Sequence, residues 1–157
     1  MTLAHRLLGV AARLYWRVAR PRTLGVRALV LDPDDRIVLV RHVGGRLWGL
    51  PGGGVRKGEG FAAALARELG EELAIAGFAV ERLLGAYHSR REGKDDHILV
   101  LVVRLDAAAA AAVRVADGWE IAAAEWFALD RLPELLSPAT GRRIAEYRRA
   151  ATGTGAW

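Results

Sequence analysis

Glutamates gather beside a glycine-rich turn in the stretch PGGGVRKGEGFAAALARELGEEL, residues 51–73. The four glutamates are Glu59, Glu68, Glu71 and Glu72. Carboxylate oxygens are the ligands that Mg²⁺ and Mn²⁺ prefer, and a cluster of like charges is a natural way to hold such an ion. The proline and glycines at the start of the stretch exclude regular helix and let another group approach the backbone closely. The residue types therefore fit a divalent-cation site.

The segment that begins at Phe61 predicts a helix, because FAAALARELGEEL consists of strong helix formers. At about 100° per residue the three later glutamates fall within an arc of roughly 100°, roughly 90° from the apolar stripe. That stripe consists of Phe61, Leu65, Leu69 and Leu73. The carboxylates then line the edge of the core, late in a helix whose dipole disfavours anions. Stability does not explain this placement, whereas a bound cation does. A solvated acidic helix face is the alternative.

A longer pattern surrounds these acids. Gly53 is followed by five residues and Glu59, then by seven residues and the run Arg67-Glu68-Leu69-Gly70-Glu71-Glu72-Leu73-Ala74-Ile75. This spacing resembles the Nudix box, G-x5-E-x7-R-E-U-x-E-E-x-G-U, in which U is a bulky apolar residue. The single departure is Ala74 in place of the last glycine, which suggests that the helix runs on slightly or ends with Gly77. The flanking LVRH…WGLPGGG and EWFALDRLPE segments are also typical of the family, so the likeness spans about residues 23–136.

The resemblance implies hydrolysis of a diphosphate linkage, usually in a nucleoside diphosphate derivative, with Mg²⁺ or Mn²⁺ as cofactor. It implies that Glu68 and Glu72 are the principal metal ligands and Glu71 a further one. Glu59 and Arg67 would brace the glycine loop against the helix, and one glutamate would activate water. We predict that the glycines Gly52, Gly53 and Gly54 approach phosphate oxygens through their backbone N–H groups.

An acid outside the box is a further candidate for the site. Glu125 occupies a position that supplies a metal ligand in some relatives, and we include it among the catalytic and metal-binding residues. Glu120 is the second candidate, and an exposed strand carboxylate is the alternative for both. Arg41 and Arg56 are candidate phosphate-binding residues, with solvated surface arginines as the alternative.

Some residues are given no catalytic role. His88 and His97 are expected to be surface or packing residues and not metal ligands. Three aromatic residues could stack on a base, although residues of this type more often serve in packing; they are Trp48, Tyr87 and Trp119.

Strand patterns precede and follow the predicted helix. VRALVL and RIVLVRH, separated by DPDD, predict a hairpin, and the valine-rich HILVLVVRL of residues 97–105 predicts a buried strand that pairs with LLGAYHSR. AEWFALD is a further strand candidate, and SPATGRRIAEYRRA predicts a helix. The alanine run 107–112 is compatible with a loop or a helical turn. We therefore expect an α+β fold, a Nudix-type α/β/α sandwich around a mixed sheet, with one domain over residues 23–150 and a frayed tail over residues 151–157.

Residues 1–22 predict a basic amphipathic helix. They hold five arginines and no acidic residue, so the formal charge of this segment equals the formal net charge of +5 of the whole chain. Because the rest of the chain is formally neutral, we expect no nucleic-acid partner. We expect the apolar stripe of this helix to pack on the domain or in a possible homodimer, and a peripheral membrane contact is the less favoured alternative.

The location and function class follow from several weaker observations. The chain has no cysteine, which fits a reducing compartment, and we expect a cytoplasmic protein. A non-catalytic module that binds a nucleotide metabolite is the main alternative to an enzyme. The presence of every box acid favours the enzyme. A hydrolase acting on RNA ends is a weaker alternative, because the formally neutral body of the chain argues against a basic groove.

Overall fold

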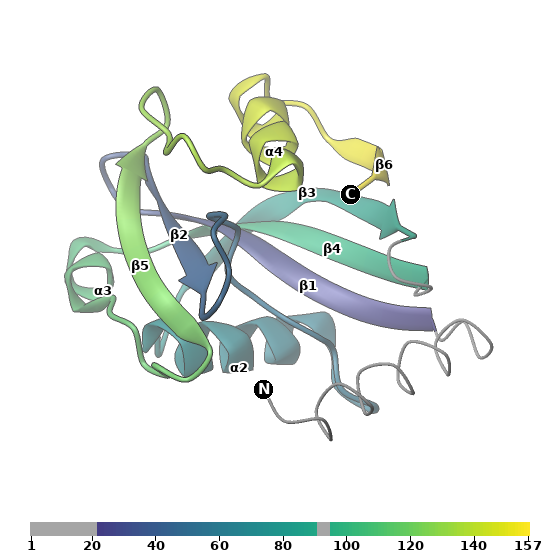
Figure 1. Ribbon diagram of the computed structural model, residues 1–157, viewed down its shortest axis with the longest axis horizontal. Helices are drawn as coiled ribbons and strands as arrows, with labels where there is room; N and C mark the ends of the chain where they lie inside the picture. Colours follow the sequence, from purple (N-terminus) through teal and green to yellow (C-terminus); the bar gives the residue numbers. More distant parts are fainter. Residues whose placement is uncertain (1–21, 91–94) are drawn as a thin grey trace.

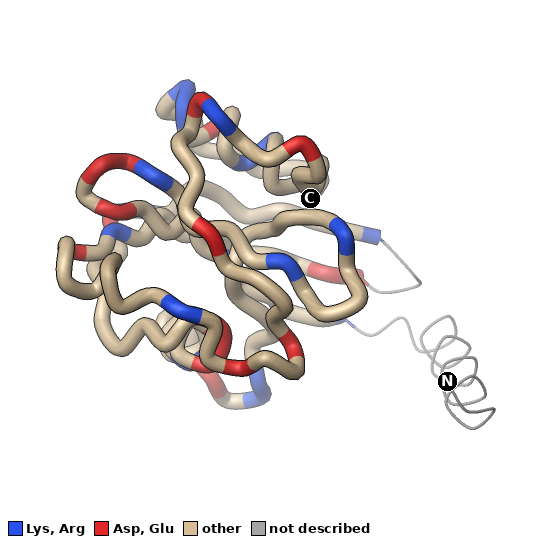
Figure 2. Tube along the Cα trace, turned by 60° about the vertical axis from the view of Figure 1, so that its left-hand side comes forward, with Lys and Arg blue, Asp and Glu red and all other residues tan. Residues whose placement is uncertain are grey.

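The computed structural model describes residues 22–90 and 95–157. The predicted N-terminal helix therefore lies outside the described residues, apart from Arg22, which begins the first strand. Within the described residues, no helix combines the length and apolar character needed to cross a membrane. Figure 2 shows Lys and Arg positions interspersed with Asp and Glu along this part of the chain.

A mixed sheet forms the centre of the molecule, and its strands lie in the order β5-β2-β1-β4-β3-β6. The strands are β1 (Arg22–Leu31), β2 (Arg36–His42), β3 (Ala79–Ser89), β4 (Asp95–Arg104), β5 (Ile121–Ala128) and β6 (Gly153–Ala156). β1 is parallel to β4 and β3 is parallel to β6, and the other neighbours are antiparallel. The two predicted hairpins, β1–β2 and β3–β4, are confirmed.

Helices cover both faces of this sheet. They are α2 (Phe61–Leu73), α3 (Ala107–Ala112) and α4 (Pro138–Arg148). Figure 1 shows α2 against one face and α4 against the other, so the expected α+β fold with an α/β/α arrangement is confirmed. The alanine run is a helix, and the Asp106 carboxylate accepts a hydrogen bond from the Ala109 N–H at 2.8 Å, which satisfies a free donor of its first turn.

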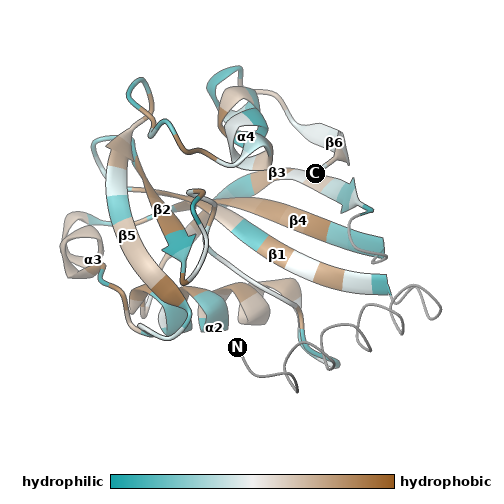
Figure 3. Ribbon diagram, viewed as in Figure 1, coloured by the Kyte–Doolittle hydropathy of each residue, from teal (hydrophilic) through white to brown (hydrophobic). Residues whose placement is uncertain are grey.

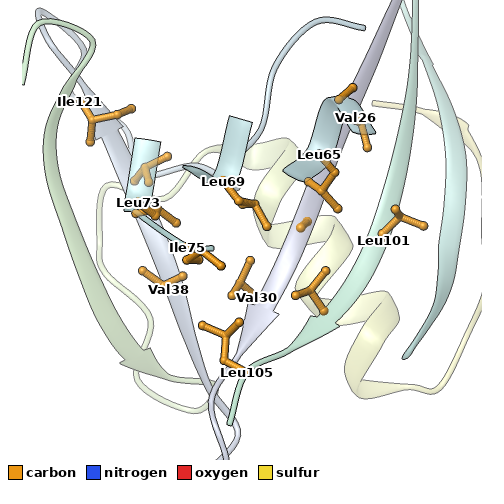
Figure 4. Packing of buried hydrophobic residues seen from close by; sticks show 14 residues of the cluster. Val26, Val30, Val38, Leu65, Leu69, Leu73, Ile75, Leu101, Leu105 and Ile121 are labelled. Atoms are coloured by element: carbon orange, nitrogen blue, oxygen red, sulfur yellow. The ribbon is translucent and has the colours of Figure 1, made fainter. Parts of the chain in front are cut away.

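Two hydrophobic cores follow from the alternation of side chains along the strands. Val26, Ala28 and Val30 of β1 face α2, while Leu29 and Leu31 belong to the core on the other face. Figure 4 shows the first core, in which α2 contributes Leu65, Leu69 and Leu73, all fully buried. Figure 3 shows the corresponding hydrophobic colour along β2 and the middle of β4. Phe61, predicted to share the apolar stripe of α2, is instead exposed.

The predicted frayed tail is wrong. Gly153–Ala156 form β6, which pairs in parallel with Gly85–His88 of β3. The buried Arg143 of α4 donates to the Ala156 carbonyl at 3.1 Å, and its guanidinium carbon lies 3.6 Å from the centroid of the Tyr87 ring. The tail is ordered because it pairs with the edge of β3 and accepts a hydrogen bond from the buried Arg143. The composition of the tail does not reveal these long-range contacts.

Candidate active site

The glycine-rich turn is held between two diverging strands. β1 and β2 pair directly at Val30–Val38 and Leu31–Ile37. Toward the other end of the pair, the segment 49–53 lies between them. Val40 exchanges hydrogen bonds with Gly49, the Ala28 N–H donates to the Pro51 carbonyl at 3.1 Å, and the Val26 N–H donates to the Gly53 carbonyl at 2.9 Å. The turn is therefore fixed by backbone bonds to both strands.

Two positions in this turn require glycine. Gly52 has φ +122°, and a Cβ there would lie 2.3 Å from the Val26 carbonyl oxygen. A Cβ on Gly53 would lie 2.4 Å from the carboxylate of Glu68. A Cβ on Gly54, by contrast, would meet no atom within 4 Å. The first two glycines thus let the turn lie directly against β1 and against the acids of α2.

Glu72 is the most deeply buried acid of α2, with 2% of its surface exposed. One carboxylate oxygen, Oε2, accepts a hydrogen bond from the Gly52 N–H at 2.8 Å. The other, Oε1, is buried and has no hydrogen-bond partner in the described part of the protein. Burial raises the pKa of Glu72 to about 7, even though the Gly52 N–H and the nearby Arg27 guanidinium both act in the opposite direction.

Arg67 joins the acids of α2 to the preceding loop. Its guanidinium donates to both oxygens of Glu59, at 2.9 and 3.0 Å, and to the Gly54 carbonyl at 2.8 Å. It also donates to Glu68 at 2.6 Å and to Glu71 at 3.2 Å. The bonds with Arg67 and the Arg56 N–H lower the pKa of Glu59 to about 2. One planar cation thus offsets part of the repulsion among the glutamates and fixes their positions.

Arg27 of β1 lies close enough to the acids of the box to interact with them electrostatically, and it was not among the residues predicted for the site. Its Nη1 atom is buried without a hydrogen-bond partner among the described residues. Burial lowers the pKa of Arg27, while Glu72, Glu68 and Glu120 act in the opposite direction. Its signal in the sequence is a lone arginine within the apolar strand VRALVL.

The structure also brings His42 and Glu120 to Glu72. Each of these three residues offers one ligand atom, and the three atoms lie within 4.8 Å of one another. His42 was not singled out in the sequence, and Glu120 was one of two candidate acids. The other, Glu125, is an exposed residue opposite Leu39 in the β2–β5 pairing, and it is not part of this group.

The remaining predicted residues lie in different surroundings. Arg56 lies 3.6 Å from the exposed carboxylate of Glu71. Arg41 lies over the ring of Trp48 at 5.6 Å, and Trp48 contacts Phe127 edge-on. Tyr87 is a buried packing residue, while Trp119 is 94% exposed.

The donor set around Glu72 fits a divalent cation. Buried carboxylate oxygens normally have hydrogen-bond partners, so the unpartnered Oε1 of Glu72 is a position where a cation would replace the missing donor. The Nη1 atom of Arg27 is the complementary case, a buried donor that an anionic oxygen would satisfy. Two unpartnered groups of opposite charge that interact electrostatically suit a cation together with an anion such as a phosphate.

Comparisons with known proteins agree with this geometry. The NUDIX domain model matches residues 21–147. The chain is 30% identical over 129 residues to a protein of Bacillus subtilis named putative 8-oxo-dGTP diphosphatase, covering 82% of each chain. It is 31% identical over 109 residues to a protein of Methanocaldococcus jannaschii named ADP-ribose pyrophosphatase, covering 68% of this chain and 62% of the relative.

A solved structure gives the same result for the fold. The crystal structure of a MutT NUDIX hydrolase from Burkholderia pseudomallei is 30% identical and superposes with a TM-score of 0.64. The match covers 80% of this chain and 97% of that chain.

Proposed function

The chain belongs to the Nudix family and is a Nudix hydrolase, and we propose that it hydrolyses the diphosphate linkage of a nucleoside diphosphate derivative with Mg²⁺ or Mn²⁺ as cofactor. The observation that carries this proposal is the pair of buried, unpartnered polar atoms, Glu72 Oε1 and Arg27 Nη1. Neither atom has a hydrogen-bond partner among residues 22–90 and 95–157, and a cation bound to a diphosphate would satisfy both.

The box acids would hold the cofactor. Glu68 and Glu72 are the proposed principal ligands and Glu71 a further one, since Glu71 is half-exposed while the other two face the turn. When bound, the divalent cation would neutralise charge on phosphate oxygens and make water more acidic. The Arg67–Glu59 brace would keep the ligands in position while the ion and the substrate exchange.

Other residues of this chain would bind the substrate and move the proton. Arg27 would donate to a phosphate oxygen from within the site, and Arg41 and Arg56 remain candidates for outer phosphate contacts. A carboxylate would accept the proton from the attacking water. Of the two acids outside the box, the geometry favours Glu120, because its ligand atom lies within 4.8 Å of those of Glu72 and His42.

The test is a substrate panel assayed with Mg²⁺ and with Mn²⁺ for release of the cleaved phosphate product. The panel includes 8-oxo-dGTP, ADP-ribose, nucleoside triphosphates, sugar nucleotides and dinucleoside polyphosphates, because two relatives carry names from the first two classes. We expect hydrolysis of at least one compound in the presence of metal and none with chelator.

The cytoplasmic location and the possible homodimer stay predictions.

A matched pair of variants separates the enzyme from a binding module. We expect Glu72→Gln to lower kcat by at least about 100-fold, the scale of removing one charge-stabilising group from an active site, while substrate binding is largely kept. Glu134→Gln changes an exposed acid outside the site and should leave kcat unchanged. Binding of a panel compound without any hydrolysis by the wild-type protein would support the non-catalytic module instead.

A further inference from the structure

Three potential metal ligands meet at the end of the β3–β4 hairpin, away from the box. His88 of β3 lies directly opposite His97 of β4. Asp95 lies two residues before His97, so both side chains point to the same face of the strand. Figure 3 shows that this end of β4 is hydrophilic, in contrast to the middle of the strand.

The ligand atoms of these residues converge. One atom from each of His88, Asp95 and His97 lies within 4.8 Å of the other two. The His88 Nε2 atom lies 2.5 Å from the Asp95 carboxylate, and the two imidazole rings are 5.0 Å apart at their centroids. An ion pair between His88 and Asp95 accounts for two of these groups, but it does not explain why a second imidazole joins them.

We propose, contrary to the expectation from the sequence for both histidines, that His88, Asp95 and His97 form a second metal site, specific for a transition-metal ion such as Zn²⁺. Imidazole nitrogen suits Zn²⁺ and related ions, whereas Mg²⁺ prefers the oxygen donors of the box. Two histidines and one carboxylate are a common protein ligand set for Zn²⁺, with the fourth position left for water or another ligand. Because the ligands come from both strands, the ion would cross-link the hairpin. The site does not depend on the proposed hydrolysis.

The surrounding structure positions the ligands in advance. The carbonyl of His88 accepts a hydrogen bond from the Trp157 N–H at 2.8 Å, so β3 is held on one side by the C-terminal strand and on the other by β4. Arg22 Nε lies 3.5 Å from the second oxygen of Asp95, and because the Arg22 side chain is exposed this ion pair is a weak contact.

The two histidines line a cavity, and all three ligands are at least partly exposed. His88 and His97 line a cavity of about 430 Å³, whose other walls include Leu24, Phe61 and Ile98. Asp95 and His88 are partly exposed and His97 is exposed. An ion can therefore reach these side chains from solvent, as a metal site in a folded protein requires.

The test is calorimetric titration of the full-length, chelator-treated protein with Zn²⁺ in excess Mg²⁺, which is added to saturate the proposed cation site of the box. We expect one Zn²⁺ per chain, and Co²⁺ in its place should give the visible absorption of a four-coordinate site with nitrogen ligands. Since loss of an outer-shell partner already costs about 10- to 100-fold in affinity, His97→Gln and Asp95→Asn should each weaken binding by at least about 100-fold.

The control is His42→Gln, which removes the only other histidine of the described residues and should leave Zn²⁺ binding unchanged. Zn²⁺ binding that is lost in His42→Gln, or kept in His97→Gln and Asp95→Asn, would overturn the proposal. A measurement without substitutions guards against misfolded variants. Zn²⁺ should shift the imidazole NMR signals of His88 and His97 in the wild-type protein, and unmoved signals would equally exclude the site.

Discussion

The acids of α2 determine which position of the glycine-rich turn must be glycine. The carboxylate of Glu68 occupies the volume that a side chain at Gly53 would need. Gly54, its neighbour, faces open space. Composition treats these glycines alike, but the structure gives them different roles.

We therefore expect Gly53→Ala to displace Glu68 and to lower kcat/KM by about 100-fold, because displacements of about 1 Å at an active site have effects of this size. Gly54→Ala, the matched control, should remain close to the wild-type protein. Steady-state kinetics with the best substrate of the panel checks both variants, and equal activity of the two would show that the Gly53–Glu68 contact has no functional weight.

The second prediction at this scale concerns Glu72 and pH. The folded-state pKa of about 7 lies above the ordinary value of 4.5, so the folded protein binds a proton that the unfolded chain releases. The metal-free protein is then stabilised below pH 4.5 and loses this contribution as the pH rises to 7, by up to about 3 kcal/mol.

Urea unfolding of the chelator-treated protein between pH 4.5 and 8 measures this dependence. Glu72→Gln has no carboxyl to titrate, so its free energy of unfolding should fall less over the same interval than that of the wild-type protein. Parallel curves for the two proteins would contradict the raised pKa.

At the scale of elements, the C-terminus of α2 shows how the structure absorbs a departure from the family pattern. The helix ends at Leu73, and Ala74 adopts the left-handed conformation with φ 57°. The expectation that the helix would run on or end with Gly77 is therefore wrong. The Ala74 N–H donates to the Gly70 carbonyl and the Ile75 N–H to the Leu69 carbonyl, so the cap forms even without glycine.

This strained alanine predicts a stabilising substitution. The left-handed conformation costs a residue with a Cβ about 1–2 kcal/mol. Glycine avoids this cost, but it loses more backbone entropy on folding, which offsets part of the gain. We expect Ala74→Gly to raise the free energy of unfolding by about 0.5–1 kcal/mol. Ala66→Gly, at an exposed position inside α2, should lower it by about 1 kcal/mol. Thermal or urea unfolding of both variants measures this contrast, and destabilisation by Ala74→Gly would refute the account of the cap.

At the scale of the whole molecule, the C-terminal strand closes one edge of the sheet. Trp157 follows β6, and its ring lies 6.2 Å from that of Tyr87. Arg143 is buried, with 2% of its surface exposed, and uses the Ala156 carbonyl as one of its acceptors. The last residues thus serve as a structural element at the opposite edge of the sheet from β5.

Removal of residues 153–157 should therefore lower the free energy of unfolding by at least about 2 kcal/mol, because it leaves a buried guanidinium short of an acceptor. A frayed tail would contribute less than about 0.5 kcal/mol. Urea unfolding of the truncated and full-length proteins distinguishes these values. A free energy of unfolding unchanged by the truncation would show that β6 does not stabilise the fold.

The sequence by itself determined the features that depend on neighbours along the chain. The period of α2, the two hairpins and the spacing that places Arg67 beside Glu68 and Glu71 are all set within a few residues, where periodicity and turn chemistry are readable. The box pattern also identified the family, because its acids lie on one helix and the loop before it.

Only the tertiary structure decided which distant residues join them. Glu120, before β5, lies beside Glu72 of α2, and Arg27 of β1 interacts electrostatically with both, although β2 separates β1 from β5 in the sheet. His88 meets Asp95 through the β3–β4 register. The burial of Glu72 likewise depends on where the turn and the strands pack. Strand order and burial arise from the packing of the whole chain, so no local pattern specifies them.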